Sequence, residues 1–454
     1  MKVLKFGGTS VGTVKSLTNV KKIIESSDER QIVVVSALGG ITDLLIKTAQ
    51  ESIRGGSEYI EGYREIIRRH YDIIDGMIAE NKRSVVRENT DILLNELGDI
   101  FKGLSLIKDL PSRTLDIVVS YGERLSSYII SNIIDDAELC NSLDFIRTGR
   151  QWGKHILDNN TTSRLIHNRF NNMTSRVAIC PGFISKDGRG DITNLGRGGS
   201  DYTAAILAAT LGAATLEIWT DVDGFMTADP RIISDAFVID KLSFIEAMEL
   251  CNFGAKVIYP PTIYPVFHRN IPIYIKNTFN PKFHGTRISD DAKPVTTRNL
   301  KGISSISDTS LITLKATHQC NIHAYEGRIL NALSRNGISI LLVSRENDIC
   351  EIMLAVAGAE AAKAKSIIND EFTAELETGD IALSEIIDNL STIAIVGENI
   401  RKDENLVERI AGMLTDNIKL LAISRGTSET TISFVVDMND RVKAMNMLHS
   451  KLFL

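Results

Sequence analysis

Two glycine-rich segments of this chain each place a positive charge beside a flexible backbone. One is Lys5-Phe6-Gly7-Gly8, at the end of a short apolar stretch, and the other is Gly196-Arg197-Gly198-Gly199-Ser200-Asp201. Glycines let backbone N–H groups approach an anion without obstruction from a Cβ atom, and the basic side chain neutralises its charge. Neither segment is a Walker A loop or a dinucleotide-binding fingerprint, so each alone is a weak signal. Together they predict a phosphate or carboxylate site, with Lys5 and the glycine–arginine turn in one cleft.

Two further clusters could contact a small polar substrate. Ser36 and Thr42 lie on either side of a paired-glycine turn that follows an apolar stretch. They could contact a ligand, or they could lie at the start of a helix with a capping role only. The sequence supports both interpretations equally. Glu123 is expected at the start of a helix, where it could interact with the helix dipole alone or pair with a substrate ammonium group.

The later part of the chain adds an aspartate cluster and a lysine. Asp221 and Asp223 are closely spaced beside a glycine, as in calcium loops, but the EF-hand spacing and its terminal glutamate are missing. Nucleotide contacts fit this segment better. Lys256 follows a predicted helix. A lone lysine in such a place is usually a solvated surface charge, so Lys256 is a candidate site residue only because the other motifs are also present.

The elements expected around these motifs alternate between strand and helix. This alternation predicts an α/β fold with a mostly parallel sheet covered by helices on both faces. Ligands bind beyond the carboxyl ends of such strands, which is where the polar clusters stand. Strands are expected over residues 3–6, 31–37, 115–120, 176–184 and 215–219, and helices over 14–25, 59–74, 123–134, 201–211 and 243–253.

The pattern changes near residues 280–303, where Pro, Gly, Thr and Asn interrupt it. Beyond this boundary, residues 325–356 match residues 405–436 without a gap at an offset of about 80 positions. Each copy is predicted to form an amphipathic helix, a strand, a polar turn and a second strand, after a first strand at 311–315 or 392–396. Two small α+β modules therefore follow the large domain.

Composition excludes several classes of function. The 454 residues are enough for two or three domains, and the net charge of −6 without a basic block argues against nucleic-acid or anionic-membrane partners. The five cysteines form no CxxC pair, which argues against zinc and a disulfide framework. No secretory h-region or bilayer-length apolar run is present, so we expect a cytoplasmic protein.

In combination, the motifs resemble those of aspartate kinases in the amino-acid-kinase superfamily. The resemblance rests on residues 5–10, 196–201, 220–224 and 253–256, and it covers essentially the whole chain. The two repeats resemble the ACT domains that sense amino acids in that family. It implies a catalytic domain over 1–295, a first ACT-like module over 303–390 completed by 440–454, and a second over 391–439 inserted in the first. Residues 275–278 and 447–453 are most similar to the kinase portion of bifunctional aspartokinase–homoserine dehydrogenases. Two alternatives stay open: a monofunctional relative or the kinase part of a longer protein.

The resemblance also implies roles for single residues, with ATP and Mg²⁺ as cofactors. Met226 departs from a tyrosine that stands beside the adenine in some lysine-sensitive relatives. Lys5, Asp201 and Lys256 are implied as catalytic; Ser36, Thr42, Glu123, Arg197, Gly198, Gly199 and Ser200 as substrate-binding; and Lys5, Phe6, Gly7, Gly8, Thr220, Asp221, Met226, Arg231, Lys256 and Val257 as nucleotide-binding.

The implied reaction transfers the ATP γ-phosphoryl group to the β-carboxylate of L-aspartate. It gives L-aspartyl 4-phosphate, the first step toward lysine, threonine and methionine. Other acceptors within the superfamily (glutamate, carbamate or a nucleoside monophosphate) stay open, as does a catalytically silent amino-acid sensor.

Feedback regulation by threonine or lysine through a homodimer or higher homo-oligomer of ACT modules is also implied. Threonine-sensitive relatives carry glutamine where this chain has Arg345 and Arg425, and these arginines could instead pair with Glu346 or Glu429. The candidate regulatory residues are Asn321, Gly327, Ser344, Arg345, Ser424 and Arg425.

Overall fold

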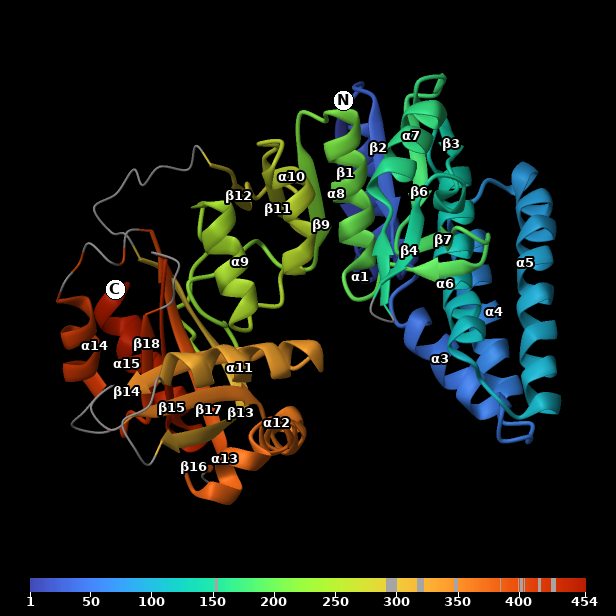
Figure 1. Ribbon diagram of the computed structural model, residues 1–454. Helices are drawn as coiled ribbons and strands as arrows, with labels where there is room; N and C mark the ends of the chain where they lie inside the picture. Colours follow the sequence, from blue (N-terminus) through green and yellow to red (C-terminus); the bar gives the residue numbers. More distant parts are fainter. Residues whose placement is uncertain are drawn as a thin grey trace. The chain divides into compact units, whose positions relative to one another are not determined.

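The computed structural model describes residues 1–151, 154–290, 300–316, 322–346, 350–383, 385–398, 400, 403, 405–414, 418–425 and 430–454 (Figure 1). The chain divides into two compact units. The first comprises Met1–Phe225 with Val257–Ala292, and the second comprises Met226–Lys256 with Lys293–Leu454. The functional domain boundaries given above stay predictions.

The first unit is built on a parallel sheet, as the alternation of strands and helices predicts. Its strands follow the order β12-β11-β9-β1-β2-β6-β3, and all neighbours run parallel except β12, which is antiparallel to β11. The bounds are β1 (Lys2–Phe6), β2 (Gln31–Val35), β3 (Ala137–Leu139), β6 (Val177–Pro181), β9 (Leu216–Thr220), β11 (Ile273–Asn277) and β12 (Thr286–Ile288). A smaller sheet has the order β5-β4-β7-β8, with β4 (Arg147–Gln151), β5 (Lys154–Leu157), β7 (Ile184–Asp187) and β8 (Ile192–Asn194).

Helices cover both faces of the large sheet. Helix α8 (Gly199–Leu211) packs on β1 and β2, while α6 (Ser112–Ile133) packs on β6 from the side of the main apolar cluster. Val33 and Val35 belong to that cluster, and every residue of β2 is buried, as expected for a central parallel strand. The other helices are α1 (Gly8–Val11), α2 (Val14–Glu25), α3 (Ile41–Ser52), α4 (Tyr59–Met77), α5 (Glu80–Ile107), α7 (Asn159–Phe170) and α10 (Tyr264–Phe267).

One expected strand is wrong. Residues 115–120 lie inside α6, so Glu123 stands in the middle of a helix and not at its start. Val118, Leu125 and Ile129 are buried at helical spacing along α6, and the short run of apolar residues before Glu123 fits a buried helix as well as a strand. The expected helix over 14–25 is confirmed, with a capping box between Thr13 and Ser16 at its start.

A buried histidine in α4 predicts acid sensitivity of the first unit. His70 is fully buried, its Nδ1–H donates to the Ile66 carbonyl at 2.7 Å, and burial lowers its pKa to about 4. As the pH falls from 6.5 toward 4, the unfolded chain binds a proton at His70 that the folded chain does not. Stability should therefore fall by about 3 kcal/mol over this range. Urea unfolding of His70→Leu should lose this slope, whereas replacement of the exposed His167 should keep it.

The second unit contains the two repeats in one sheet. Its order is β14-β15-β13-β17-β19-β18, with β16 beside β13. The predicted order of elements in each repeat is confirmed. The bounds are β10 (Lys241–Leu242), α9 (Phe244–Asn252), β13 (Leu300–Ala316), α11 (Ile322–Arg335), β14 (Ile340–Glu346), β15 (Glu351–Ala357), α12 (Gly358–Glu371), α13 (Thr373–Thr378), β16 (Ile381–Leu383), β17 (Ile387–Gly397), α14 (Leu406–Leu414), β18 (Ala422–Arg425), β19 (Thr431–Asp437) and α15 (Arg441–Leu452).

Strand β13 is shared by both repeats. Its residues 300–311 pair with β17 of the second repeat, with irregular register after Ser307, and its residues 309–315 pair with β15 of the first. Helix α15, which we expected to complete the first module, packs with the second repeat: Met445 and Leu448 share a cluster with Ile410 and Phe434. Within the described residues, no helix is both long and apolar enough to cross a membrane.

Candidate active site

The first glycine motif lies at the carboxyl edge of the large sheet. Strand β1 ends at Phe6, and the Gly7 N–H donates to the Trp219 carbonyl of β9 at 3.2 Å. Gly8 passes close to the turn after β2, because a Cβ atom on Gly8 would lie 3.3 Å from the Gly39 Cα. Gly8 and Gly39 therefore lie in close contact where these two turns meet, and both line the cavity described below.

The second glycine motif reaches the same edge because α8 packs across β1 and β2. Gly196 and Gly198 have φ of +75° and +68°, the left-handed region that favours glycine. Gly198 is also covered by Tyr259, since an added Cβ would lie 2.3 Å from the Tyr259 Cβ. Helix α8 begins immediately after this turn, so its free backbone N–H groups lie there as well.

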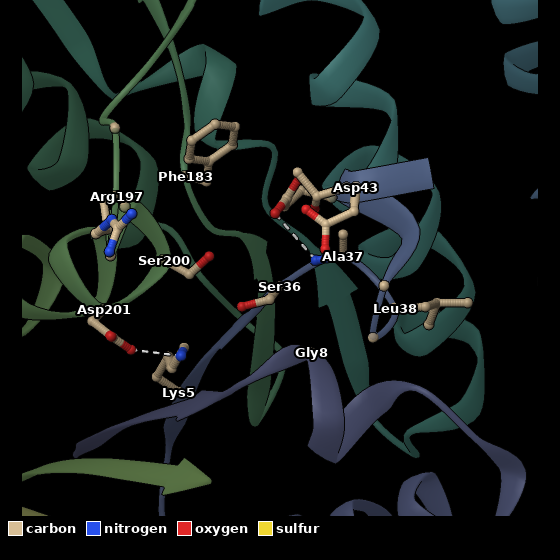
Figure 2. A pocket seen from close by; sticks show the side chains of 17 residues that line it. Lys5, Gly8, Ser36, Ala37, Leu38, Asp43, Phe183, Arg197, Ser200 and Asp201 are labelled. Carbon is tan, nitrogen blue, oxygen red and sulfur yellow. Dashed lines mark hydrogen bonds and ion pairs between the residues drawn. The ribbon is translucent and has the colours of Figure 1, made fainter. Parts of the chain in front are cut away.

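An ion pair joins the two motifs. The Lys5 Nζ lies 2.6 Å from the Asp201 Oδ1, and the two side chains are only 11% and 12% exposed. Lys5 comes from β1 and Asp201 from the first turn of α8 (Figure 2). The prediction that Lys5 and the glycine–arginine turn share one cleft is confirmed.

The cleft is a cavity of about 370 Å³, the size of a small polar metabolite site. Figure 2 shows Arg197, Ser200 and Asp201 on one wall and Ser36, Ala37 and Asp43 on the other. The structure thus brings together every residue implied as substrate-binding, although their roles stay predictions. The lining residues are Lys5, Gly8, Ser36, Ala37, Leu38, Gly39, Gly40, Thr42, Asp43, Glu123, Phe183, Gly196, Arg197, Gly198, Gly199, Ser200 and Asp201.

Glu123 brings a buried carboxyl to this cavity. Its Oε1 accepts the Ala37 N–H at 3.1 Å, while its Oε2 is buried without a hydrogen-bond partner among the described residues. Burial raises the pKa of Glu123 to about 8, although the Ala37 N–H and the Lys5 charge act in the opposite direction. A buried carboxyl oxygen without a partner is costly, so this geometry suits a cationic ligand group.

Some residues implied in nucleotide binding lie near this edge, and others do not belong to this unit. Thr220 ends β9, the neighbour of β1, and Asp221 follows it; Val257 is also in the first unit. Phe6 is buried and stacks on Trp219, so only its backbone can face a ligand. Met226, Arg231 and Lys256 belong to the second unit, and their contribution stays a prediction.

Phe183 lines the cavity from outside every motif that the sequence singled out. It has a φ of +67°, a rare conformation for an aromatic residue that is often found at functional sites. Its N–H donates to the Thr203 hydroxyl and its carbonyl accepts the Leu195 N–H, which hold the strained backbone in place. The only sequence signal was the preceding Gly182.

Several candidate regulatory residues are also placed. Ser344 donates to the Ile423 carbonyl at 3.2 Å, which links β14 to β18, and Ser424 lies in β18. Arg345 pairs with Glu326 of α11 at 3.0 Å. Gly327 lies in α11, whereas Asn321, Glu429 and the side chains of Glu346 and Arg425 lie outside the described residues. Which of these residues contact an effector stays a prediction.

Comparison with known proteins establishes the family. Residues 1–277 match the amino acid kinase family and residues 393–452 match an ACT domain. The chain therefore belongs to the amino acid kinase family.

Its relatives and structural neighbours are aspartokinases. It is 32% identical to a bifunctional aspartokinase/homoserine dehydrogenase of Buchnera aphidicola, over 100% of this chain and 56% of that protein. It is 28% identical to lysine-sensitive aspartokinase 3 of Escherichia coli, over 99% of both chains. The chain spans about half the length of the bifunctional relatives that it matches. The structure of E. coli aspartokinase III in complex with aspartate and ADP matches over 100% of both chains, with a TM-score of 0.84 and 27% identity.

Proposed function

We propose that this chain is an ATP-dependent aspartate kinase that forms L-aspartyl 4-phosphate. The observation that carries the proposal is the arrangement of charges in one cavity: Lys5 and Asp201 at one end, with Arg197 and Glu123 also lining it. The aspartokinase III neighbour, solved with aspartate and ADP, supports the same substrates. A cytoplasmic location is part of the same proposal.

The cavity suits an amino acid with two carboxylates. Glu123 can accept the α-ammonium group through its unpartnered Oε2, and the Arg197 guanidinium can hold the α-carboxylate by two parallel hydrogen bonds. The β-carboxylate has an ordinary pKa of about 3.9, so it is already a nucleophile at neutral pH. The chain therefore needs no general base, and its task is to bring two anions together.

Lys5 and the glycine turns meet that requirement. The Lys5 ammonium offsets the negative charge on the phosphoryl group being transferred, and the Gly8 backbone lines the cavity beside it, where no Cβ atom obstructs phosphate oxygens. The described residues contain no cluster of three or more metal-ligating side chains. Mg²⁺ usually binds one or two protein carboxylates together with phosphates and water, and we propose that Asp201, in the cavity beside Lys5, would be such a carboxylate. Bound there, Mg²⁺ would neutralise phosphate charge.

Regulation by an amino acid forms the second part of the proposal. The ACT match, the repeated modules and the aspartokinase III structure solved with lysine and aspartate support an effector site in the second unit. Lysine or threonine is the proposed effector, and assembly as a homodimer or higher homo-oligomer through the ACT modules is expected.

A hydroxamate assay with aspartate, ATP and Mg²⁺ tests the activity. We expect turnover with aspartate and little with glutamate, carbamate or nucleoside monophosphates, and inhibition by lysine or threonine but not by methionine. Absence of aspartate turnover together with tight binding of an amino acid would instead indicate a sensor.

Replacing Arg197 tests recognition of the α-carboxylate. Arg197→Lys keeps the charge but loses the planar pair of donors, so the KM for aspartate should rise about 10-fold while the KM for ATP changes little. Steady-state kinetics with each substrate varied in turn measures both constants. An unchanged KM for aspartate would remove Arg197 from the substrate site.

A further inference from the structure

Helix α6 carries a second acidic side chain on the same side as Glu123. Asp116 precedes Glu123 by seven residues, which is two helical turns or about 10.5 Å along the axis. Asp116 does not line the cavity, yet it is half-buried, and burial raises the pKa of its carboxyl group, opposed by His155 and Asn194. Neither the proposed reaction nor the sequence motifs give this residue a role.

Asp116 fixes the orientation of a side-chain amide. The Asn194 Nδ2 donates to the Asp116 Oδ1 at 2.7 Å. The other end of the same amide, Oδ1, accepts the Gly196 N–H at 2.8 Å. Because an amide has one donor end and one acceptor end, the carboxylate determines which atom faces Gly196. Without Asp116 only the Gly196 N–H would hold the amide in this orientation, and the amide nitrogen would lose the partner that fixes it.

The bond to Gly196 sets the start of the glycine–arginine turn. Gly196 has a φ of +75°, and its carbonyl accepts the Gly199 N–H at 3.0 Å, which closes the turn around Arg197. Arg197 itself is exposed, so its direction depends on this backbone and not on packing of its side chain. Other contacts surround the pair without replacing it: the His155 Nε2 lies 3.9 Å from the Asp116 Oδ2, and Arg113 pairs with Asp191.

We propose that Asp116 is a positioning residue that acts through Asn194 on the turn carrying Arg197. Helix α6 thus positions both groups that recognise the amino acid: Glu123 directly, and Arg197 through the Asp116–Asn194 pair. This inference rests on the proposed function for its substrate, but the control of the turn by Asp116 can be tested without it.

An exchange of the two side chains tests the proposal. Asn194→Asp alone places two carboxylates against each other, so we expect the KM for aspartate to rise about 10- to 100-fold, with kcat and the KM for ATP changed less than about 3-fold. The double variant Asp116→Asn with Asn194→Asp restores the bond between positions 116 and 194 with donor and acceptor exchanged, and it keeps an acceptor oxygen for the Gly196 N–H. It should return the KM to within about 3-fold of wild type. Arg113→Gln is the matched control on α6, because its exposed ion pair contributes little.

Hydrogen exchange gives a readout that does not depend on turnover. The backbone amides of residues 196–199 should exchange faster in Asn194→Asp and recover in the double variant. If Asn194→Asp fails to fold, Asp116→Ala replaces it, with the same rise in KM and in exchange expected. Unchanged exchange, or a folded double variant that does not recover, would overturn the proposal. Wild-type protein without aspartate turnover would count against the proposed function alone, with exchange still deciding the role of Asp116.

Discussion

Replacement of Lys5 by methionine is expected to lower kcat at least about 100-fold, the usual cost of losing one preorganised group that stabilises a transition state. Lys5 is the cation placed between the two glycine turns, and its ammonium group is held by Asp201 at 2.6 Å. Methionine keeps much of the side-chain length but carries no charge to offset repulsion between the two anionic reactants. Single-turnover kinetics with saturating ATP and aspartate would measure the chemical step directly.

The controls must separate catalysis from folding. Removing Lys5 leaves the Asp201 carboxylate buried without its partner, which can destabilise a protein by about 3–5 kcal/mol. The double variant Lys5→Met with Asp201→Asn removes that buried charge, so it should regain stability without regaining activity. Lys15→Met, on the exposed face of α2, should behave as wild type. A folded Lys5→Met enzyme within a few-fold of wild-type kcat would exclude the proposed role.

Replacement of Glu123 by glutamine is expected to raise the KM for aspartate about 100-fold, because a neutral amide cannot pair with the α-ammonium group. The wild-type enzyme should also show a pH dependence that the variant lacks. With a pKa of about 8, Glu123 is mostly protonated in the free enzyme at pH 7, whereas an ammonium group requires the carboxylate. Aspartate binding should therefore release a proton, and the KM should be about 10-fold higher at pH 6.5 than at pH 8.

The free energy of unfolding gives an independent measure of the raised pKa of Glu123. An unfolded glutamate ionises near pH 4.5, but the folded protein keeps Glu123 protonated until about pH 8. Wild-type stability is therefore lost progressively as the pH rises between these values, and Glu123→Gln should not show that loss. Urea unfolding at several pH values tests this, with the exposed Glu88→Gln as control. A KM for aspartate that does not change with pH in wild type would show that Glu123 is not the ammonium partner.

The sequence predicted the core of the site because glycines constrain the backbone locally. Lys5 and Asp201 both flank turns that demand glycine, and adjacent parallel strands bring such turns to one sheet edge. The glycine pattern could not predict Phe183 as a site residue, because a phenylalanine gives no sequence signal for a φ of +67°.

Long-range contacts explain why other features escaped prediction. Residues 226–256 pack with the second unit, through contacts such as the Ile303 N–H to the Thr227 carbonyl at 2.7 Å and the Glu398 N–H to the Glu246 Oε1 at 3.0 Å. No local pattern encodes such pairings. Arg345 likewise pairs with Glu326, which belongs to another element, α11, and which no local pattern pointed to.

Strand β13 has a mechanical consequence for the repeats. A single continuous strand joins both halves: residues 300–311 pair with β17, residues 309–315 pair with β15, and residues 309–311 belong to both ladders. Hinge bending between the halves would have to break this ladder, so they cannot reorient as loosely tethered lobes. A distortion of one half would therefore act directly on the other through the strand that they share.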